Sequence, residues 1–190
     1  MKKIFLFLAL CVIIAGAASA QDQSGQKGFD KSKLFIGGAF GLAFGSYSTA
    51  INISPQVGYR FSPLFAAGAG VNYAYYNYKY YTYSNTLYEK DIYSYAGMNI
   101  FGRLYPIPFL FIQAQPEVNY IWGKQQYYNP DGEYKIPSQF VPSLLLGGGA
   151  AIPTGRNGAV TFSILYDVVQ NSLSPYYHQP LYAFGFAFGF

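Results

Sequence analysis

The sequence predicts an all-β protein, an eight-stranded antiparallel up-and-down transmembrane β-barrel with short periplasmic turns and longer extracellular loops. Three observations predict this fold. Large apolar residues alternate with small or polar ones along most of the chain, with the period of a β-strand. Charged residues make up only 11% of the chain and aromatic residues 21%, whereas soluble domains hold about 25% charged residues. After the N-terminal segment no apolar run is long enough for a spanning helix, and only helices and closed barrels satisfy their backbone groups in hydrocarbon.

Residues 1–20 have the pattern of a cleaved secretory signal. Lys2 and Lys3 form a short basic start, and an apolar run follows over residues 4–14. The sequence Ala-Ser-Ala at 18–20 supplies the small residues that a signal peptidase site requires. We therefore expect export through a cleaved signal peptide.

The segment directly after the signal is polar, and the remainder of the chain shows the alternation of a β-strand. Residues 21–33 are expected to form a flexible periplasmic N-terminal arm, and residues 34–190 to form the barrel. The only cysteine, Cys11, lies within the signal, so the exported chain is expected to contain no disulfide and no Cys-ligated metal. Its net charge of about +2, after loss of two lysines, is too small and scattered to indicate nucleic-acid binding.

Eight strands are expected from the alternation, each long enough for a tilted strand to cross a bilayer. They span residues 34–45, 50–61, 65–76, 91–104, 109–122, 138–152, 159–170 and 182–190. Three strands contain prolines, at Pro55, Pro116 and Pro142. Each proline removes one donor from the ladder, so a bulge or bend is expected there.

Connections alternate in length, as in outer-membrane barrels whose termini both lie in the periplasm. The expected short turns are 62–64, 105–108 and 153–158, and the expected longer loops are 77–90, 123–137 and 171–180. The first loop, 46–49, is short and departs from this alternation.

The interior of the barrel is expected to hold the polar and charged strand residues. These are Arg60, Arg103, Glu117, Asp167, Asn52, Gln56, Gln113 and Gln115. A polar plug is the favoured interpretation, and a gate or proton path is the alternative, because buried charges must be paired or hydrogen-bonded. A soluble lipocalin-like barrel would require the opposite orientation, with the large aromatic residues packed into an interior that is already full at eight strands.

Tyrosines concentrate between residues 73 and 95 and recur near residue 127. One interpretation is an aromatic girdle at the membrane interface; the other is a surface that binds a partner, because tyrosine gives large contact area at low entropic cost. The candidate extracellular binding rim comprises Tyr76, Tyr78, Tyr80, Tyr81, Tyr83, Tyr88, Tyr127 and Tyr128. Its possible partners are an extracellular protein or glycan and neighbouring lipopolysaccharide.

Two alternative functions are less well supported. A lipid A-modifying enzyme would need a base beside a nucleophile, and the only histidine, His178, could meet Ser172 or Ser174 only if the last loop folds back. A narrow pore is disfavoured because side chains fill the interior of an eight-stranded barrel. We assign no catalytic residues, cofactor or metal site, since one histidine without cysteines does not supply a usual transition-metal site.

The end of the chain carries a resemblance. Aromatic residues occupy every second position of the last strand: Tyr182, Phe184, Phe186, Phe188 and Phe190. This segment resembles the C-terminal assembly signal of outer-membrane barrels, and the resemblance implies recognition by the barrel-assembly machinery. The chain as a whole resembles small barrels of the OmpX/OmpA type, without a peptidoglycan-binding domain. That resemblance implies residence in the outer membrane of a Gram-negative bacterium and a structural, adhesive or unassigned role.

Overall fold

The computed structural model describes residues 30–128, 130–155 and 157–189. The expected signal (1–20), most of the expected arm and Phe190 therefore lie outside the described residues. A single 3-10 turn, η1 (Lys31–Lys33), forms the end of the segment expected to be a flexible arm. Within the described residues no helix is long and apolar enough to cross a membrane.

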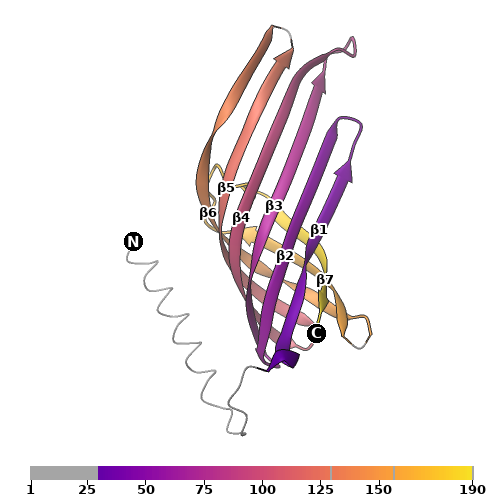
Figure 1. Ribbon diagram of the computed structural model, residues 1–190, viewed down its shortest axis with the longest axis vertical. Coiled ribbons are helices and arrows are strands. Elements are labelled where there is room, and N and C mark those ends of the chain that lie inside the picture. The colour runs from indigo at the N-terminus through magenta and orange to yellow at the C-terminus, as the bar shows by residue number, and fades with distance from the viewer. Residues whose placement is uncertain (1–29, 129, 156, 190) are drawn as a thin grey trace, which may run out of the picture. The chain divides into compact units, whose positions relative to one another are not determined.

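Eight strands form one antiparallel sheet that closes into a ring, because each strand pairs with the next and β8 pairs with β1 (Figure 1). The strands are β1 (Leu34–Phe44), β2 (Ser48–Ser62), β3 (Phe65–Tyr81), β4 (Leu87–Ile107), β5 (Leu110–Tyr128), β6 (Asp131–Pro153), β7 (Gly158–Asp167) and β8 (Pro180–Phe188). The predicted closed sheet of eight up-and-down strands is confirmed.

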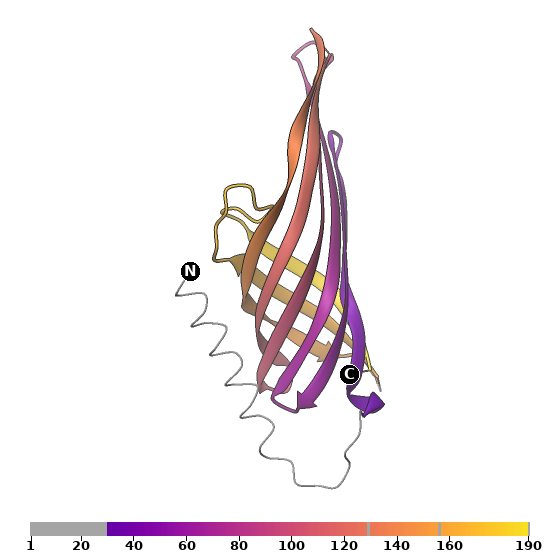
Figure 2. The same cartoon turned by 60° about the vertical axis from the view of Figure 1, so that its left-hand side comes forward.

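The strands differ greatly in length. β3 to β6 contain 17 to 23 residues, whereas β7 and β8 contain 10 and 9. Figures 1 and 2 show β3–β6 continuing well beyond the loop that joins β7 to β8. We call this continuation the projecting sheet. The segments 77–90 and 123–137, expected to be loops, are mostly strand in the structure.

The strand conformation of these two segments has a physical cause. Both segments are rich in tyrosine, which favours strands, and their residues pair across the hairpins, as Tyr78 does with Asp91 and Gln125 with Tyr134. Only residues 82–86 remain as a turn at the β3–β4 tip, where Thr82 and Thr86 are joined by a backbone hydrogen bond of 2.9 Å.

The opposite end of the ring has short connections, at 63–64, at 108–109 and between β6 and β7, and we call it the turn end. The expected bulges at prolines are wrong, because the register is unchanged on both sides of Pro55, Pro116 and Pro142. At each proline the ladder lacks one N–H donor, yet the strand register does not change. The shifts lie elsewhere, at Arg60/Ser62, Tyr80/Tyr81, Leu104/Ile107 and Ile121/Gly123.

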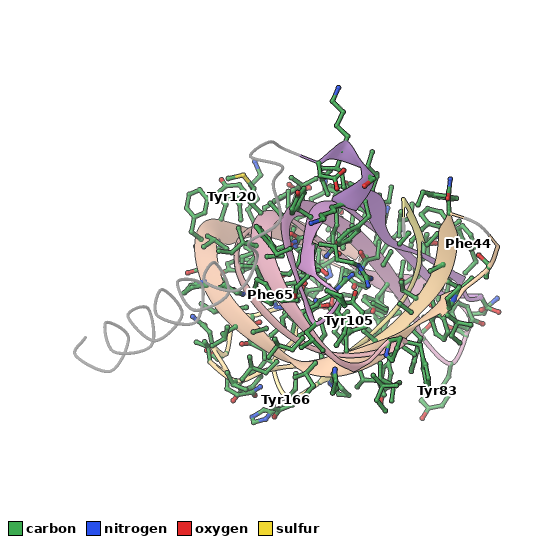
Figure 3. The ribbon with its side chains drawn as sticks, turned by 90° about the horizontal axis from the view of Figure 1, so that it is seen from below. Phe44, Phe65, Tyr83, Tyr105, Tyr120 and Tyr166 are labelled. Carbon is green, nitrogen blue, oxygen red and sulfur yellow. The ribbon has the colours of Figure 1, made fainter. Side chains whose placement is uncertain are left out.

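Side chains alternate between a buried inner face and an exposed outer face of the ring. Figure 3 shows Tyr105 within the ring and Tyr120 and Tyr166 outside it. Met98 and Ile100 are 73% and 62% exposed, while the intervening Asn99 is buried. The ring therefore has an apolar exterior and a largely polar interior.

Two apolar clusters lie inside the ring, one at each end of this polar interior. The cluster at the turn end contains Phe35, Ala66, Phe101, Tyr105, Phe111 and Ala151. The cluster at the opposite end contains Ala74, Tyr95, Leu145, Leu165 and Tyr176. Tyr176 comes from the loop after β7, which places its ring against that of Tyr95 at 6.0 Å.

Candidate functional site

A chain of hydrogen-bonded polar side chains follows the interior of the ring. Four of its members alternate along β5, so that their side chains share the inner face. The bonds run from Arg103 Nε to Gln113 Oε1 (2.7 Å), Gln113 Nε2 to Gln115 Oε1 (2.7 Å), Gln115 Nε2 to Glu117 Oε2 (3.0 Å), Asn119 Nδ2 to Glu117 Oε1 (2.5 Å) and Asn72 Nδ2 to Asn119 Oδ1 (2.5 Å). We call this chain the luminal network.

The luminal network connects two of the expected interior charges without joining them directly. Arg103 and Glu117 are both buried, and Gln113 and Gln115 link them through hydrogen bonds. Arg103 pairs with Gln113, four residues before Glu117 along β5, which is too far for a direct contact within the hairpin. Glu117 has both oxygens bonded by amide donors, which is how a carboxylate is stabilised away from water.

Arg103 lies in an aromatic and amide environment. Its guanidinium carbon is 4.6 Å from the ring centre of Phe101 and 4.8 Å from that of Phe111, and one terminal nitrogen donates to Gln56 Oε1 at 3.0 Å. Among the described residues no carboxylate oxygen lies within 4.0 Å of this guanidinium. Arg103 is thus a buried cation held by neutral acceptors and aromatic faces.

The other expected interior residues lie in different surroundings. Arg60, half-buried, places its guanidinium carbon 4.8 Å from the ring centre of Tyr105. Asn52 and Gln56 are half-buried and line a cavity of about 150 Å³, which Arg103 and Glu117 also line.

Asp167 belongs to a separate cluster that holds the last loop. Its Oδ1 accepts the backbone N–H groups of Leu144 and Val169 at 3.1 Å, and its Oδ2 accepts the Ser174 hydroxyl at 2.7 Å. The Ser174 oxygen also lies 3.1 Å from that of Ser143. The Asp167 carboxylate therefore anchors the segment that carries Tyr176 into the ring.

The same loop shows how His178 is placed. Its backbone N–H donates to Gln170 Oε1 at 3.1 Å, and its ring lies 4.0 Å from that of Tyr177. In the part of the chain that the structure describes, no hydrogen bond joins the His178 imidazole to Ser172 or Ser174. Ser174 instead bonds directly to a carboxylate, without an intervening base.

The inner face continues upward from the luminal network onto the projecting sheet. Paired residues share a face, so each rung can be followed across β3 to β6. One rung consists of Tyr78, Asp91, Gln125 and Tyr134, and the next consists of Tyr80, Glu89, Tyr127 and Gly132. We name the side chains Tyr78, Tyr80, Tyr93, Tyr127 and Tyr134 the tyrosine face; all five are exposed.

The expected rim is divided between two faces. Tyr78, Tyr80 and Tyr127 belong to the tyrosine face, whereas Tyr128 pairs with Asp131 on the opposite face and Tyr83 is fully exposed at the β3–β4 tip. Sequence reasoning did not assign Tyr93 or Tyr134 to the rim, because the strand register that aligns them was unknown.

Three other rim tyrosines pack against aromatic neighbours. Tyr76 is half-buried and stacks on Tyr95 at 6.3 Å, so it extends the interior cluster rather than the surface. Tyr81 lies 4.9 Å from the ring of Tyr47, and Tyr88 lies 6.4 Å from that of Tyr80.

The opposite, outer face of the projecting sheet is basic. Lys79 lies directly across from Lys90, and Lys124 from Lys135. We name these four side chains the lysine face. Glu133 is the acid on this face that pairs with one of them, with its Oε2 3.1 Å from Lys124 Nζ. The hydrogen bond from Lys124, and to a smaller extent the one from Gln126, lowers the pKa of the Glu133 carboxyl.

The described residues contain no group of three or more His, Cys, Asp or Glu side chains placed to hold a metal ion. No protein-family model matches the chain, and a search of curated proteins finds no relative.

Proposed function

We propose that this chain is an outer-membrane β-barrel of a Gram-negative bacterium, exported through the signal at residues 1–20, with a non-enzymatic, surface-binding role. The observation that carries the proposal is the continuity of one exposed aromatic face above a ring with an apolar exterior. The ring supplies the membrane anchor, and the tyrosine face supplies the binding surface.

The distribution of side chains on the ring supports the membrane location. Large apolar residues such as Ile100, Ile112 and Phe184 are 59–64% exposed on the outer face. The inner face buries Arg103 and Glu117. A soluble lipocalin-like barrel has the reverse arrangement, with an apolar interior and a polar exterior, while a barrel in lipid needs an apolar exterior.

The tyrosine face supports a binding role. It combines exposed phenol rings with the carboxylate of Glu89 and the amide of Gln125 on the same rungs. Rings provide a broad apolar contact, and acceptors between them bind hydroxyl groups. A hydroxyl-rich glycan is the partner that this combination fits best, and a protein segment is the alternative.

The lysine face supports an orientation in the outer leaflet. Its four lysines lie on the same side of the sheet as the apolar exterior, where Lys124 pairs with Ile92, and this side would face neighbouring lipid. Lipopolysaccharide carries phosphate groups at this level, and lysine ammonium groups bind phosphate as point charges. Lipopolysaccharide is therefore the expected neighbour of this face.

The location is tested by labelling intact cells with a membrane-impermeant amine reagent. Lys79, Lys90, Lys124 and Lys135 are expected to react without permeabilisation, because the projecting sheet would lie outside the cell. Lys31 and Lys33, at the turn end, serve as internal controls and should react only after permeabilisation. Reaction of both sets only after permeabilisation would contradict the outer-membrane orientation.

The binding role is tested with two matched sets of variants on a glycan array. Replacing Tyr78, Tyr80, Tyr127 and Tyr134 together by Ser should reduce binding by about tenfold or more, since each removes a contact ring. Replacing Tyr83 and Tyr128 by Ser should leave binding unchanged. Equal binding by wild type and both variants would count against the tyrosine face, and binding to proteins but to no glycan would identify the alternative partner.

A further inference from the structure

The ring closes through its shortest ladder. β1 and β8 are joined by four residue pairs, from Ile36–Phe188 to Ala39–Gly185, whereas β1 pairs with β2 over eleven. Continuing the register would pair residues 40–44 with 180–184, but these residues do not pair in the described part of the chain. We call this separated stretch the seam.

The seam opens into the polar cavity of about 150 Å³. That cavity is lined on one side by Gly41 of β1 and on the other by Ala183 of β8, and it extends inward to Gln56, Arg103 and Glu117. Gly41 occupies an inner-face position of β1 yet is exposed, which agrees with an opening between β1 and β8. Phe40, Tyr182 and Phe184 also line it, from the outer face.

Backbone chemistry limits what can cover the seam. Each separated edge presents N–H and C=O groups to its missing neighbour, and hydrocarbon offers them no partner. An occupant of the seam must therefore be apolar where it meets the aromatic side chains on the outer face and polar where it reaches the cavity. Those requirements describe an amphiphile.

Arg103 sets the charge of the polar group. It is 7% exposed, lines the cavity, and has no carboxylate within 4.0 Å among the described residues. A buried cation is stabilised most by an anion in hydrogen-bonding contact, and guanidinium matches carboxylate geometry. Glu117 does not fill this role, because neither of its oxygens lies within 4.0 Å of the guanidinium; they accept from Gln115 and Asn119 instead.

We infer that the seam admits a single-chain amphiphile with a carboxylate head, of the fatty-acid class, whose head enters the cavity near Arg103 while its chain leaves between β1 and β8. The cavity has the volume of about five water molecules, enough for a carboxylate and the first methylenes. The remaining chain lies along Phe40, Tyr182 and Phe184. This inference rests on the proposed location in a membrane.

The test uses the full exported chain in phosphatidylcholine vesicles and a diazirine-bearing dodecanoic acid. After irradiation, mass spectrometry of the digest should place the adducts on residues 37–41 and 181–187. Gly41→Leu should reduce labelling about tenfold, because the added side chain extends into the cavity beside the seam, where its Cβ would meet only Asn52 Cβ at 3.7 Å. Gly102→Leu is the matched control, since its Cβ would meet Phe65 Cε2 at the same 3.7 Å, away from the seam.

The head group is tested separately. Arg103→Gln retains an amide donor but removes the charge, so labelling by the acid should fall about tenfold, while labelling by the corresponding diazirine-bearing alcohol should be weak in both proteins. Equal labelling by acid and alcohol, or labelling spread evenly around the outer face, would overturn the inference.

Two further measurements separate the remaining outcomes. Heat-dependent gel migration and vesicle flotation show for each variant whether the folded barrel is in the membrane. A folded, inserted protein without seam labelling refutes the inference alone, whereas a protein that does not insert refutes the proposed function as well. Disulfide-linked dimers of a Leu42→Cys variant would show that a second copy covers the seam, which would also overturn the inference.

Discussion

Asp167 is the residue on which the position of the last loop depends most directly. The sequence placed it on the inner face of a strand, and it is completely buried in the structure. Its three hydrogen-bond donors come from β6, from the residue two positions after it, and from Ser174. Periodicity predicts the inward direction of such a side chain, but not the partners that the loop 168–179 brings back to it.

Replacing Asp167 by Ala is expected to destabilise the protein by about 3 kcal/mol, because buried donors of Leu144, Val169 and Ser174 lose their acceptor. Urea unfolding of the protein in detergent micelles measures the change. Asp131→Ala removes an exposed carboxylate at the start of β6 and should change stability very little. Equal effects of the two substitutions would contradict the anchoring role.

The strands of the ring could be predicted from the sequence where one face of the strand is apolar and the other is small or polar. The expected strand at 65–76 corresponds to the lower part of β3, and the strand at 109–122 to that of β5. The projecting sheet was not predictable in this way, since tyrosine occupies both alternation classes from 75 to 81. Both of its faces carry exposed tyrosines, such as Tyr127 and Tyr128, so hydrophobic alternation does not mark it. Its two faces become distinct only through register, which aligns Tyr78 with Asp91 and Lys79 with Lys90.

Close packing between β6 and β7 gives a prediction for these elements. A side chain at Gly147 would overlap the carbonyl oxygen of Ile164 and approach Leu165 Cα at 2.9 Å. Gly147→Val should therefore cost about 3 kcal/mol and reduce the folded, heat-modifiable form on a gel. Gly132→Val, in the projecting part of the same strand, meets no atom within 4 Å and should fold normally. Normal folding of Gly147→Val would show that the two strands can separate.

At the scale of the whole molecule, two apolar clusters enclose a polar interior. Tyr105 and Phe101 fill the turn end, and Tyr95 and Tyr176 fill the other. The sequence predicted the polar interior from strand residues, but Tyr176 lies in a loop outside that pattern. The luminal network is consequently separated from both ends of the ring by side chains.

The enclosed interior predicts that the wild-type protein does not conduct ions. Planar-bilayer recordings should show no discrete steps, because apolar constrictions block water and ions at both ends. Tyr176→Ala alone should also be silent, since the cluster at the turn end remains. The double variant Tyr105→Ala, Tyr176→Ala is the positive comparison. Discrete steps from the wild type would establish the narrow pore instead.

The four-pair closure between β1 and β8 also has a consequence for folding. These strands lie at opposite ends of the described chain, so their pairing has the greatest sequence separation of any in the sheet, while the other strands are joined to neighbours in sequence. Closing so long a loop has a large entropic cost, and only a few contacts between β1 and β8 offset it. Ring closure is thus expected to be the last step of folding and the first to reverse on heating. The seven pairings between consecutive strands are expected to form before β1 pairs with β8.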